Sequence, residues 1–464
     1  MIAKALVWLR NDLRLADNPA LHAAFKLGGA ITALFVHESN PQLRDPGAAV
    51  RWWLEQSLDL LARSLNERNI ELIVADGEAL NTIEQLIEEN NFDTVFWNRR
   101  YAPQEREVDA VIKSGLKDKG LRVESFAGNL LVEPWEIKSG NGGSYQVFTP
   151  YAKSLRQHGV SRPLPLPDRS VETTTVKHTP KQKNYKEAVW SRKMSGLWMI
   201  GEAAAIDQLY HFFDTTIRDY AGDRDRPDLD GTSKLSAHLR FGEISPRQVW
   251  HATVSLMDQD HSTVPGGQKF LSELIWRDFH YHQLYYRPDI AEIDMRDTLA
   301  NTRWQSNSVG GINSWRRGGK TGIPIIDAGM RQLWATGWMH NRVRMLVASA
   351  LCKNMQIDWR EGEKWFWDTL VDADVASNPG NWQWVAGCGM DAAPPYFRVF
   401  NPVLQGEKFD TKGVYVRKWV PEIAALPDCW IHKPFAAPPA VLREAGVVLG
   451  QTYPLPIFTP SKAC

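Results

Sequence analysis

The sequence predicts two folded parts, an α/β domain with a doubly wound parallel sheet and a large all-α domain after it. Up to residue 132, short apolar runs alternate with amphipathic helical stretches, which is the pattern of a parallel sheet covered by helices. After residue 200, apolar residues recur at helical spacing in long segments. Between these parts the periodicity fades in a stretch rich in proline, threonine and lysine. We therefore expect the α/β domain over residues 1–132, a long interdomain linker over 133–199 and the helical domain over 200–464.

The individual elements follow from this alternation. The five expected strands are short apolar runs of mostly strand-forming residues: 5–9, 30–36, 70–75, 94–97 and 123–126. The helical patterns are longer and amphipathic: 50–67 and 82–89 in the first part, and 202–218, 270–285 and 325–351 in the second. Neither glycine-rich motif that binds dinucleotides or nucleoside triphosphates follows the first strand, so the sequence does not support those two kinds of site.

Composition narrows the classes of function. The 464 residues carry 54 Lys and Arg against 54 Asp and Glu, so net charge predicts no nucleic-acid or membrane partner, and a DNA site needs a local cluster of cations. The four cysteines form no zinc or disulfide pattern, and no leader or membrane-spanning run is apparent. We expect a cytoplasmic protein without a metal site. The 20 tryptophans are unusually many; most should fill the core, although tryptophans beside a redox ligand could carry electrons.

The segment 337–345, GWMHNRVRM, is the most informative in the chain. On a helix, Asn341 and Met345 lie four residues apart and share a face. An amide and a thioether together suit a flat aromatic ligand, although such a pair taken alone is more often structural. A ligand site is favoured by the polar and aromatic residues that accompany the pair: Arg344, Asp372, Asp374, Asn378, Trp382 and Trp384.

The segment 231–236, GTSKLS, has two interpretations. Thr232, Ser233 and Ser236 can cap a helix, or they can offer donors to a phosphate at its N-terminus. Capping is the stronger interpretation on residue types alone.

The segment SELIWR places Glu273, Trp276 and Arg277 within one helical turn. Glu273 and Arg277 can form a surface ion pair beside a core tryptophan. Alternatively, Glu273 can bond to a base, with Trp276 as a stacking wall and Arg277 at a cofactor. Spacing alone leaves both interpretations open.

Taken together, these segments resemble the photolyase/cryptochrome family over nearly the whole chain. The similar stretches keep their order and spacing: VWLRNDLRLADNPAL, FWNRRY, FTPYAK, YAGDRDRPDLDGTSKLS, ELIWRDF, KTGIPIIDAGMRQLWATGWMHNRVRM, DWREGE, NWQW and TYPLPI. Within the family, WMHNRVRM with Asn341 and Met345 is most like a class I cyclobutane pyrimidine dimer photolyase, because photolyases acting on (6-4) lesions typically carry histidines at that pair. The resemblance implies a carbon–carbon lyase that repairs pyrimidine dimers in DNA by electron transfer from light-excited FADH⁻ to the flipped-out dimer.

The resemblance also implies a U-shaped FAD, reduced in the active form, in the helical domain. The residues expected to hold it are Tyr220, Thr232, Ser233, Lys234, Leu235, Ser236, Glu273, Arg277, Asn341, Arg344, Asp372, Asp374 and Asn378. Arg344 and Asp372 should pair beneath the isoalloxazine, because a buried arginine needs a carboxylate partner. Asn378 would lie beside flavin N5, where an amide can hydrogen-bond without acting as an acid. Plant cryptochromes carry an aspartate there.

The dimer itself would meet five side chains. Trp276 and Trp384 would flank its apolar faces, Glu273 and Asn341 would bond to its polar edge, and Met345 would lie against a base. The tryptophan chain that reduces oxidised FAD under light would run through Trp382, Trp359 and Trp304. DNA would be contacted around the pocket mouth by Lys153, Arg224, Trp276, Arg342 and Arg398.

The resemblance further implies an antenna chromophore in the N-terminal domain, either methenyltetrahydrofolate or an 8-hydroxy-deazaflavin, near Asn98, Arg99, Tyr101 and Glu105. Damaged DNA is the expected partner of a monomer that needs no other protein. The main alternative is a blue-light sensor of the cryptochrome type without repair activity. Repair of (6-4) lesions is disfavoured by the missing histidine pair, and an ordinary flavin oxidoreductase by the lack of a recognisable nicotinamide site.

Overall fold

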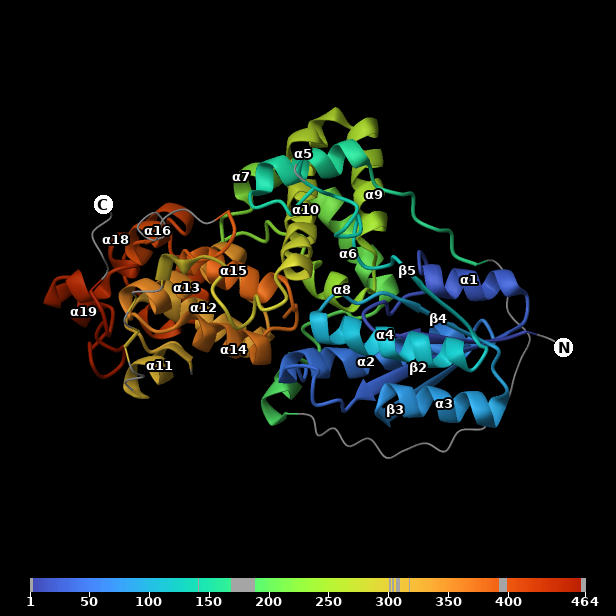
Figure 1. The fold of residues 1–464 in the computed structure, drawn as a ribbon. Helices are drawn as coiled ribbons and strands as arrows, with labels where there is room; N and C mark the ends of the chain where they lie inside the picture. Colours follow the sequence, from blue (N-terminus) through green and yellow to red (C-terminus); the bar gives the residue numbers. More distant parts are fainter. Residues whose placement is uncertain are drawn as a thin grey trace.

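The computed structural model describes residues 3–140, 142–167, 188–299, 302, 304–305, 309–316, 318–391 and 399–459. A five-stranded parallel sheet forms the centre of its N-terminal part (Figure 1). The strands, in the spatial order β3-β2-β1-β4-β5, are β1 Lys4–Leu9, β2 Ala30–Glu38, β3 Glu71–Gly77, β4 Thr94–Asn98 and β5 Arg122–Phe126. All five overlap the runs predicted as strands, and the predicted doubly wound domain is confirmed.

Four helices cover the sheet: α1 Pro19–Leu27, α2 Ala48–Asn66, α3 Ala79–Asn90 and α4 Pro103–Asp118. Alternate residues of the central strand face the two layers. Ala5, Val7 and Leu9 share an apolar cluster with α1 and α2, whereas Leu6 and Trp8 share one with α3 and α4. After β3 the chain returns to the middle of the sheet and adds β4 and β5 on the opposite side of β1. Because crossovers between parallel strands are right-handed, this reversal places α3 and α4 on the other face from α1 and α2. Burial on both faces explains why the strands read as nearly continuous apolar runs.

From residue 202 onwards the described chain is largely helical, which confirms the predicted class of the second part. The longer helices are α6 Glu202–Thr215, α9 Pro246–Gln259, α10 Val264–Tyr286, α12 Pro324–Thr336, α13 Asn341–Ser349, α14 Trp359–Thr369 and α15 Ser377–Ala386. The shorter helices are α7 Tyr220–Asp223, α8 Ser236–Phe241, α11 Val309–Arg316, α16 Pro402–Phe409, α17 Val414–Trp419, α18 Asp428–Ile431 and α19 Pro439–Glu444. In Figure 1, α11 to α19 gather on the side of the molecule away from the sheet.

The prediction of one helix over 325–351 is wrong. Gly337, with a φ of 70°, ends α12 in the left-handed conformation and donates its N–H to the carbonyl of Leu333. The chain turns, and α13 begins at Asn341. The apolar spacing continues across the turn because both helices bury residues in the same core, so periodicity alone concealed the break.

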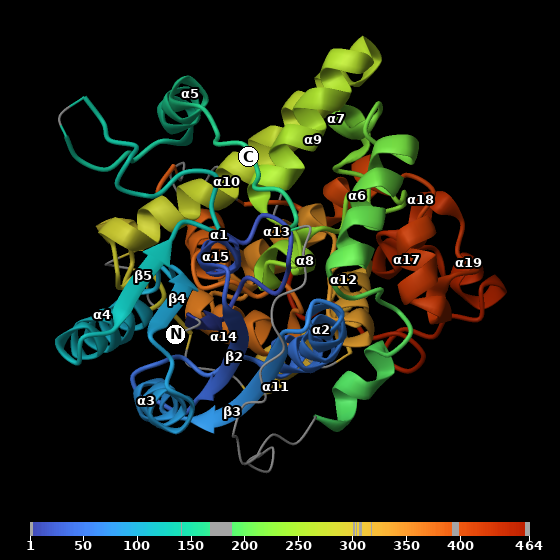
Figure 2. The same cartoon turned by 90° about the vertical axis from the view of Figure 1, so that its right-hand side faces the viewer.

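The predicted linker contains regular structure where it is described. Helix α5, Phe148–His158, packs beside α10 (Figure 2), with the ring centroids of Tyr151 and Phe279 5.1 Å apart. Residues 168–187 lie outside the described part. The domain limits at 132 and 199 stay predictions.

Buried polar contacts join the sheet to the helical part. Asp17, which follows β1, accepts hydrogen bonds from Arg247 at 2.8 Å and from the hydroxyl of Ser245. Arg14 donates to the carbonyl of Gly242 at 2.9 Å. Buried charges with several partners are costly to separate, so these contacts fix how the sheet sits against the helices. None of the helices in the described ranges has both the length and the apolar character needed to cross a membrane.

Candidate active site

A cavity of about 460 Å³ opens between α10, α13 and α15. Its volume is within the range of about 300–1,000 Å³ that is typical of ligand sites. Most of its lining residues are ones predicted to bind a ligand: Arg224, Ser236, Glu273, Trp276, Arg277, Asn341, Arg342, Arg344, Met345, Asp372, Asn378, Trp382 and Trp384. Segments far apart in the sequence therefore meet around one space.

His340 fixes the start of α13 and with it the direction of the predicted ligand-binding pair. Its Nδ1 accepts a hydrogen bond from the backbone N–H of Arg342 at 3.2 Å. Burial lowers the pKa of His340 to about 4, so the ring is neutral at physiological pH and can act as this acceptor. Helix α13 then carries Asn341 and Met345 on one face, and both line the cavity.

Arg344 and Asp372 form the predicted ion pair at the cavity wall. Nη1 and Nη2 of the guanidinium donate to the two carboxylate oxygens at 3.1 and 2.8 Å. Asp372 is also bonded by the hydroxyl of Ser236 at 2.6 Å, and Nε of Arg344 donates to the carbonyl of Met339 at 2.8 Å. A bidentate pair with these additional bonds has a fixed orientation, so it presents a defined donor and acceptor pattern to a ligand.

Asp374 supports the start of α15 and does not border the cavity. Its Oδ1 accepts the backbone N–H groups of Ala376 and Ser377, and its Oδ2 accepts the hydroxyl of Tyr281 at 2.5 Å. Burial raises the pKa of Asp374, but nearby cations, Arg277 foremost, and these hydrogen bonds outweigh it, and the resulting pKa lies below the usual value. The carboxylate is therefore ionised and already engaged within the chain, and its predicted contact with FAD stays a prediction.

Asn378 offers its oxygen, rather than its amide nitrogen, to a ligand in the cavity. Its Nδ2 donates to the carbonyl and to Oε1 of Glu363, at 3.0 and 2.8 Å. Glu363 is held in turn by Arg44, whose two terminal nitrogens donate to its carboxylate at 2.8 Å each, and the Arg44 guanidinium lies 3.8 Å from the ring centroid of Trp367. Both amide hydrogens of Asn378 are used in this network, so its free function is that of an acceptor.

The other predicted cofactor residues lie around the cavity rather than on it. Thr232 and Lys234 line a neighbouring hollow of about 330 Å³, whereas Tyr220 and Leu235 are buried in an apolar cluster. The hydroxyl of Ser233 accepts the backbone N–H of Leu235 at 3.4 Å. Helix α8 has no side-chain cap, so the capping interpretation of GTSKLS is wrong. Phosphate binding by this segment stays a prediction.

The cavity has the chemistry that a flavin dinucleotide requires. Arg277 and Arg344 place guanidinium groups on its wall, and Asp372 and Asn378 place hydrogen-bond acceptors there. Trp382 is buried on the lining, and its indole N–H has no hydrogen-bond partner within the described part of the chain. Buried donors are rarely left unpaired, so an absent ligand is a natural partner for this one.

Two ion-pair groups occupy a half-buried edge of the cavity. Glu273 is bridged by Arg224 at 3.0 Å and by Lys269 at 3.1 Å. Arg342 pairs with Asp225. Arg224 and Arg342, two of the three arginines predicted to bind DNA, are therefore paired with carboxylates of the chain in this structure. One of these carboxylates, Glu273, is the predicted lesion-binding residue.

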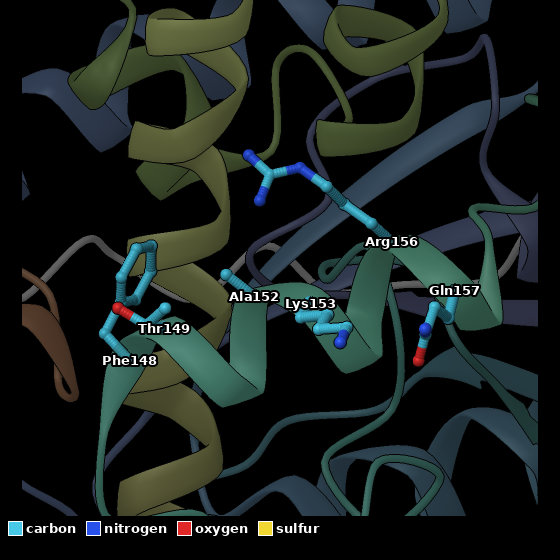
Figure 3. A pocket seen from close by; sticks show the side chains of 6 residues that line it. All are labelled: Phe148, Thr149, Ala152, Lys153, Arg156 and Gln157. Atoms are coloured by element: carbon cyan, nitrogen blue, oxygen red, sulfur yellow. The ribbon is translucent and has the colours of Figure 1, made fainter.

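The two predicted walls of the lesion site, Trp276 and Trp384, both border the cavity. Phe148 stacks on Trp276, with ring centroids 3.8 Å apart. Lys153 is exposed on α5 and lines a shallow groove along that helix (Figure 3). Arg398, predicted to bind DNA, lies outside the described residues.

The predicted electron-transfer tryptophans differ in burial. Trp382 borders the cavity and packs edge-on against Phe366, with ring centroids 5.0 Å apart. Trp359 is fully buried at the start of α14, and its N–H donates to Asp294 at 2.9 Å. Trp304 is half-buried. Transfer from one to the next stays a prediction.

A second cavity, of about 400 Å³, lies where the carboxyl ends of the strands meet the helical part. This is where open α/β sheets usually bind ligands. Arg10 borders it and is buried, with Nε and Nη1 unpartnered among the described atoms. Of the four residues expected near an antenna, Glu105 borders this cavity. The other three bond within the chain: Asn98, Arg99 and Tyr101.

Three residues that hold predicted site residues in place were not found from the sequence: Lys269, which borders the cavity, and Arg44 and Glu363, which anchor Asn378. Lys269 lies four residues before Glu273 on α10, a spacing that could have revealed it. Arg44 and Glu363 are 319 positions apart and had no local signal. Only the packing of the sheet domain against α14 brings them together.

Two family models match the chain. The one described as DNA photolyase matches residues 5–168, and the one described as the FAD binding domain of DNA photolyase matches residues 270–464. The deoxyribodipyrimidine photo-lyase of Agrobacterium fabrum is 46% identical over 99% of this chain and 96% of its own length. The Escherichia coli protein of the same name is 37% identical over 99% and 96%.

Solved structures agree with these matches. A structure titled a bacterial class III photolyase, from Agrobacterium tumefaciens, superposes with a TM-score of 0.93 at 45% identity and covers 99% of this chain and 95% of its own. A Synechocystis cryptochrome superposes with a TM-score of 0.88 at 30% identity, covering 99% and 97%. The chain therefore belongs to the photolyase/cryptochrome family, as its motifs predicted, and the prediction that it is an enzyme of the photolyase kind is confirmed.

Proposed function

We propose that this protein splits cyclobutane pyrimidine dimers in DNA in a light-driven reaction, with reduced FAD held in the helical domain. One observation carries the proposal: residues predicted to hold FAD and residues predicted to receive the dimer border a single cavity of about 460 Å³. Relatives named deoxyribodipyrimidine photo-lyase support it. When bound, reduced FAD supplies the electron that opens the dimer after light is absorbed, and it takes the electron back afterwards.

The chain contributes orientation and a fixed electrostatic environment. The oxygen of Asn378 can accept a hydrogen bond from a flavin N–H, and an amide has no proton to give at neutral pH. Arg44 and Glu363 fix that amide. The Arg344–Asp372 pair gives the cofactor one cation and one acceptor at fixed positions. Such a site suits a flavin that must stay fully reduced and anionic.

The lesion would meet both apolar and polar groups. Trp276 and Trp384 offer flat apolar surfaces, and Met345 offers a polarizable one. Glu273 can accept a hydrogen bond from a pyrimidine N–H, and Asn341 can both donate and accept. A dimer already stacks and pairs poorly, so turning it out of the helix costs less than turning out an intact base pair.

The phosphates around a flipped dimer would compete for cations that the chain now pairs internally. Arg224 could exchange Glu273, and Arg342 could exchange Asp225, for a phosphate oxygen. This exchange would free the Glu273 carboxylate from Arg224 as the dimer arrives, with Lys269 still beside it. A chain without net charge would thus gain a local cationic surface only where damaged DNA binds.

The proposal is tested with a thymine-dimer oligonucleotide and purified protein carrying reduced FAD. Near-ultraviolet to blue light should restore the two thymines, a dark control should not, and a (6-4) substrate should remain unchanged. The alternative is a blue-light sensor, and the similarity to a Synechocystis cryptochrome supports it. Protein with bound, reducible FAD that repairs neither lesion would favour the sensor.

Finer assignments belong to the same proposal. Membership of class I rests on Asn341 and Met345, while one similar structure is titled class III. We place the antenna, methenyltetrahydrofolate or an 8-hydroxy-deazaflavin, in the cavity of about 400 Å³ beside the sheet; chromophore extraction and absorption spectroscopy would identify it. A monomeric state without an obligate protein partner, and a cytoplasmic location, stay predictions.

A further inference from the structure

The indole of Trp276 has one covered ring face. Phe148 stacks on it with ring centroids 3.8 Å apart and planes within 2° of parallel. Trp276 borders the cavity, whereas Phe148 borders the shallow groove of α5, so the stacked pair separates the two hollows. Figure 3 shows Phe148 at the N-terminal end of α5, with its ring beside α10.

Phe148 is itself held in place from two sides. Its backbone N–H donates to the carboxylate of Asp391 at 3.4 Å, and the N–H of Asp391 donates to the carbonyl of Gln146 at 3.2 Å. Behind it, Tyr151 packs on Phe279 of α10. The Phe148 ring itself packs edge-on against Phe279 of α10, with ring centroids 5.9 Å apart. The ring is therefore tied to the helix that carries Trp276, and the Phe148 backbone to the segment that follows α15. It forms a fixed surface for the indole.

A half-exposed tryptophan with both faces open could rotate about its broad χ2 torsion. A parallel ring on one face restricts that rotation, together with Phe279 edge-on at 5.7 Å and His280 tilted at 5.9 Å, while the indole still borders the cavity. Holding a binding group in its bound orientation before the ligand arrives raises affinity, because less entropy is lost on binding. Stacked aromatic pairs contribute on the order of two- to tenfold in an equilibrium constant.

We propose that Phe148 is a positioning residue that holds Trp276 as a rigid wall against the pyrimidine dimer. This inference rests on the proposed function, because it takes the ligand beside Trp276 to be a pyrimidine dimer. It adds that the preference of the protein for damaged over undamaged DNA depends on the ring of Phe148, which lies outside the cavity. Phe148 acts through Trp276 and contacts neither FAD nor the dimer.

The test compares Phe148→Leu, which keeps apolar bulk but removes the ring, with Phe148→Tyr, which keeps the ring. We expect Phe148→Leu to lower the ratio of dimer affinity to undamaged-DNA affinity about two- to tenfold, and Phe148→Tyr to retain the ratio. FAD content and thermal unfolding of both variants serve as controls for folding. An equal loss of affinity for both DNAs in Phe148→Leu would overturn the proposal.

A double-mutant cycle separates positioning from general packing. In a Trp276→Leu background, Phe148→Leu should have no further effect on the affinity ratio, because the ring that it positions is gone. If the two substitutions instead lower the ratio independently, Phe148 acts by another route and the proposal fails.

A measurement without DNA keeps the inference separate from the proposed function. In holoenzyme labelled with 5-fluorotryptophan, the ¹⁹F resonance of Trp276 is assigned as the one lost in Trp276→Leu. We expect one sharp line in the unsubstituted protein and in Phe148→Tyr, and a broadened or shifted line in Phe148→Leu. An unchanged line in Phe148→Leu would refute the positioning role. An unsubstituted protein without preference for the dimer would refute the proposed function, and the ¹⁹F spectrum would still decide on Phe148.

Discussion

Replacing Glu273 by alanine should separate recognition of the dimer from general attraction to DNA. In the structure its carboxylate is shared by Arg224 at 3.0 Å and Lys269 at 3.1 Å. The substitution removes a charged acceptor for the dimer and leaves two cations unpaired beside the cavity. Lesion binding and phosphate binding should therefore change in opposite directions.

The magnitudes follow from these two losses. A hydrogen bond to a charged group contributes about 1.5–3 kcal/mol, which is about 10- to 150-fold in dimer affinity. Each cation that gains a phosphate steepens the dependence of log affinity on log salt by roughly 0.7–0.9. We thus expect Glu273→Ala to lower kcat/KM for dimer repair by at least about tenfold. Undamaged DNA should bind no more weakly at low salt, with a steeper salt dependence.

The assay is fluorescence anisotropy with dimer-containing and undamaged oligonucleotides at several salt concentrations, together with repair kinetics. Glu273→Gln is the matched control, because it keeps the side-chain size and loses only the charge; its loss of dimer affinity should be smaller than that of the alanine variant. FAD binding should weaken less than repair does. A parallel loss of affinity for both DNAs, or a loss of bound FAD as large as the loss of repair, would contradict the role assigned to Glu273.

Two further substitutions test other parts of the site, and a third tests the buried His282 of α10, whose Nε2 accepts the backbone N–H of Tyr145 at 3.0 Å. Trp382→Phe should block light-driven reduction of oxidised FAD while sparing repair by chemically reduced enzyme; absorbance spectroscopy under illumination would detect normal photoreduction, which would disprove its role. Asp372→Asn leaves Arg344 without its carboxylate partner and should weaken FAD binding by about 3–5 kcal/mol at most. Equilibrium dialysis measures FAD binding, and unchanged binding would contradict the role of the ion pair. Burial lowers the pKa of His282 to about 4 from an ordinary 6.5, so the stability from this neutral ring is complete above pH 6.5 and is lost as the pH falls towards 4. Between pH 6.5 and pH 4, the free energy of unfolding should fall less steeply in His282→Gln than in the unsubstituted protein, by up to about 1.4 kcal/mol per pH unit. Urea titration at several pH values measures this slope, and an unchanged slope would contradict the lowered pKa of His282.

Periodicity predicted most of the fold because burial follows it closely. The strands of the sheet are covered on both faces and read as apolar runs, and the amphipathic stretches became helices. Periodicity failed between α12 and α13, where a left-handed glycine ends one helix while apolar spacing continues into the next. Periodicity also failed to predict α5, because this helix is stabilised by packing against α10, which is distant in the sequence.

The site was predictable where its residues lie in one segment or match a family motif. Asn341 and Met345 could be placed on one face from their spacing alone, and both line the cavity. The anchoring of Asn378 by Glu363 and Arg44 could not be predicted, because Arg44 lies 319 positions from Glu363 in the sequence. A network closed by tertiary packing leaves no spacing pattern in the sequence.

The most direct test of the account is the rate of thymine-dimer loss per photon absorbed by enzyme-bound reduced FAD, measured on purified protein from which any antenna has been removed. We predict repair only under illumination, with an action spectrum that follows the absorption of the bound reduced flavin. Repair that continues in the dark, or illuminated holoenzyme that binds the dimer and leaves it intact, would contradict it.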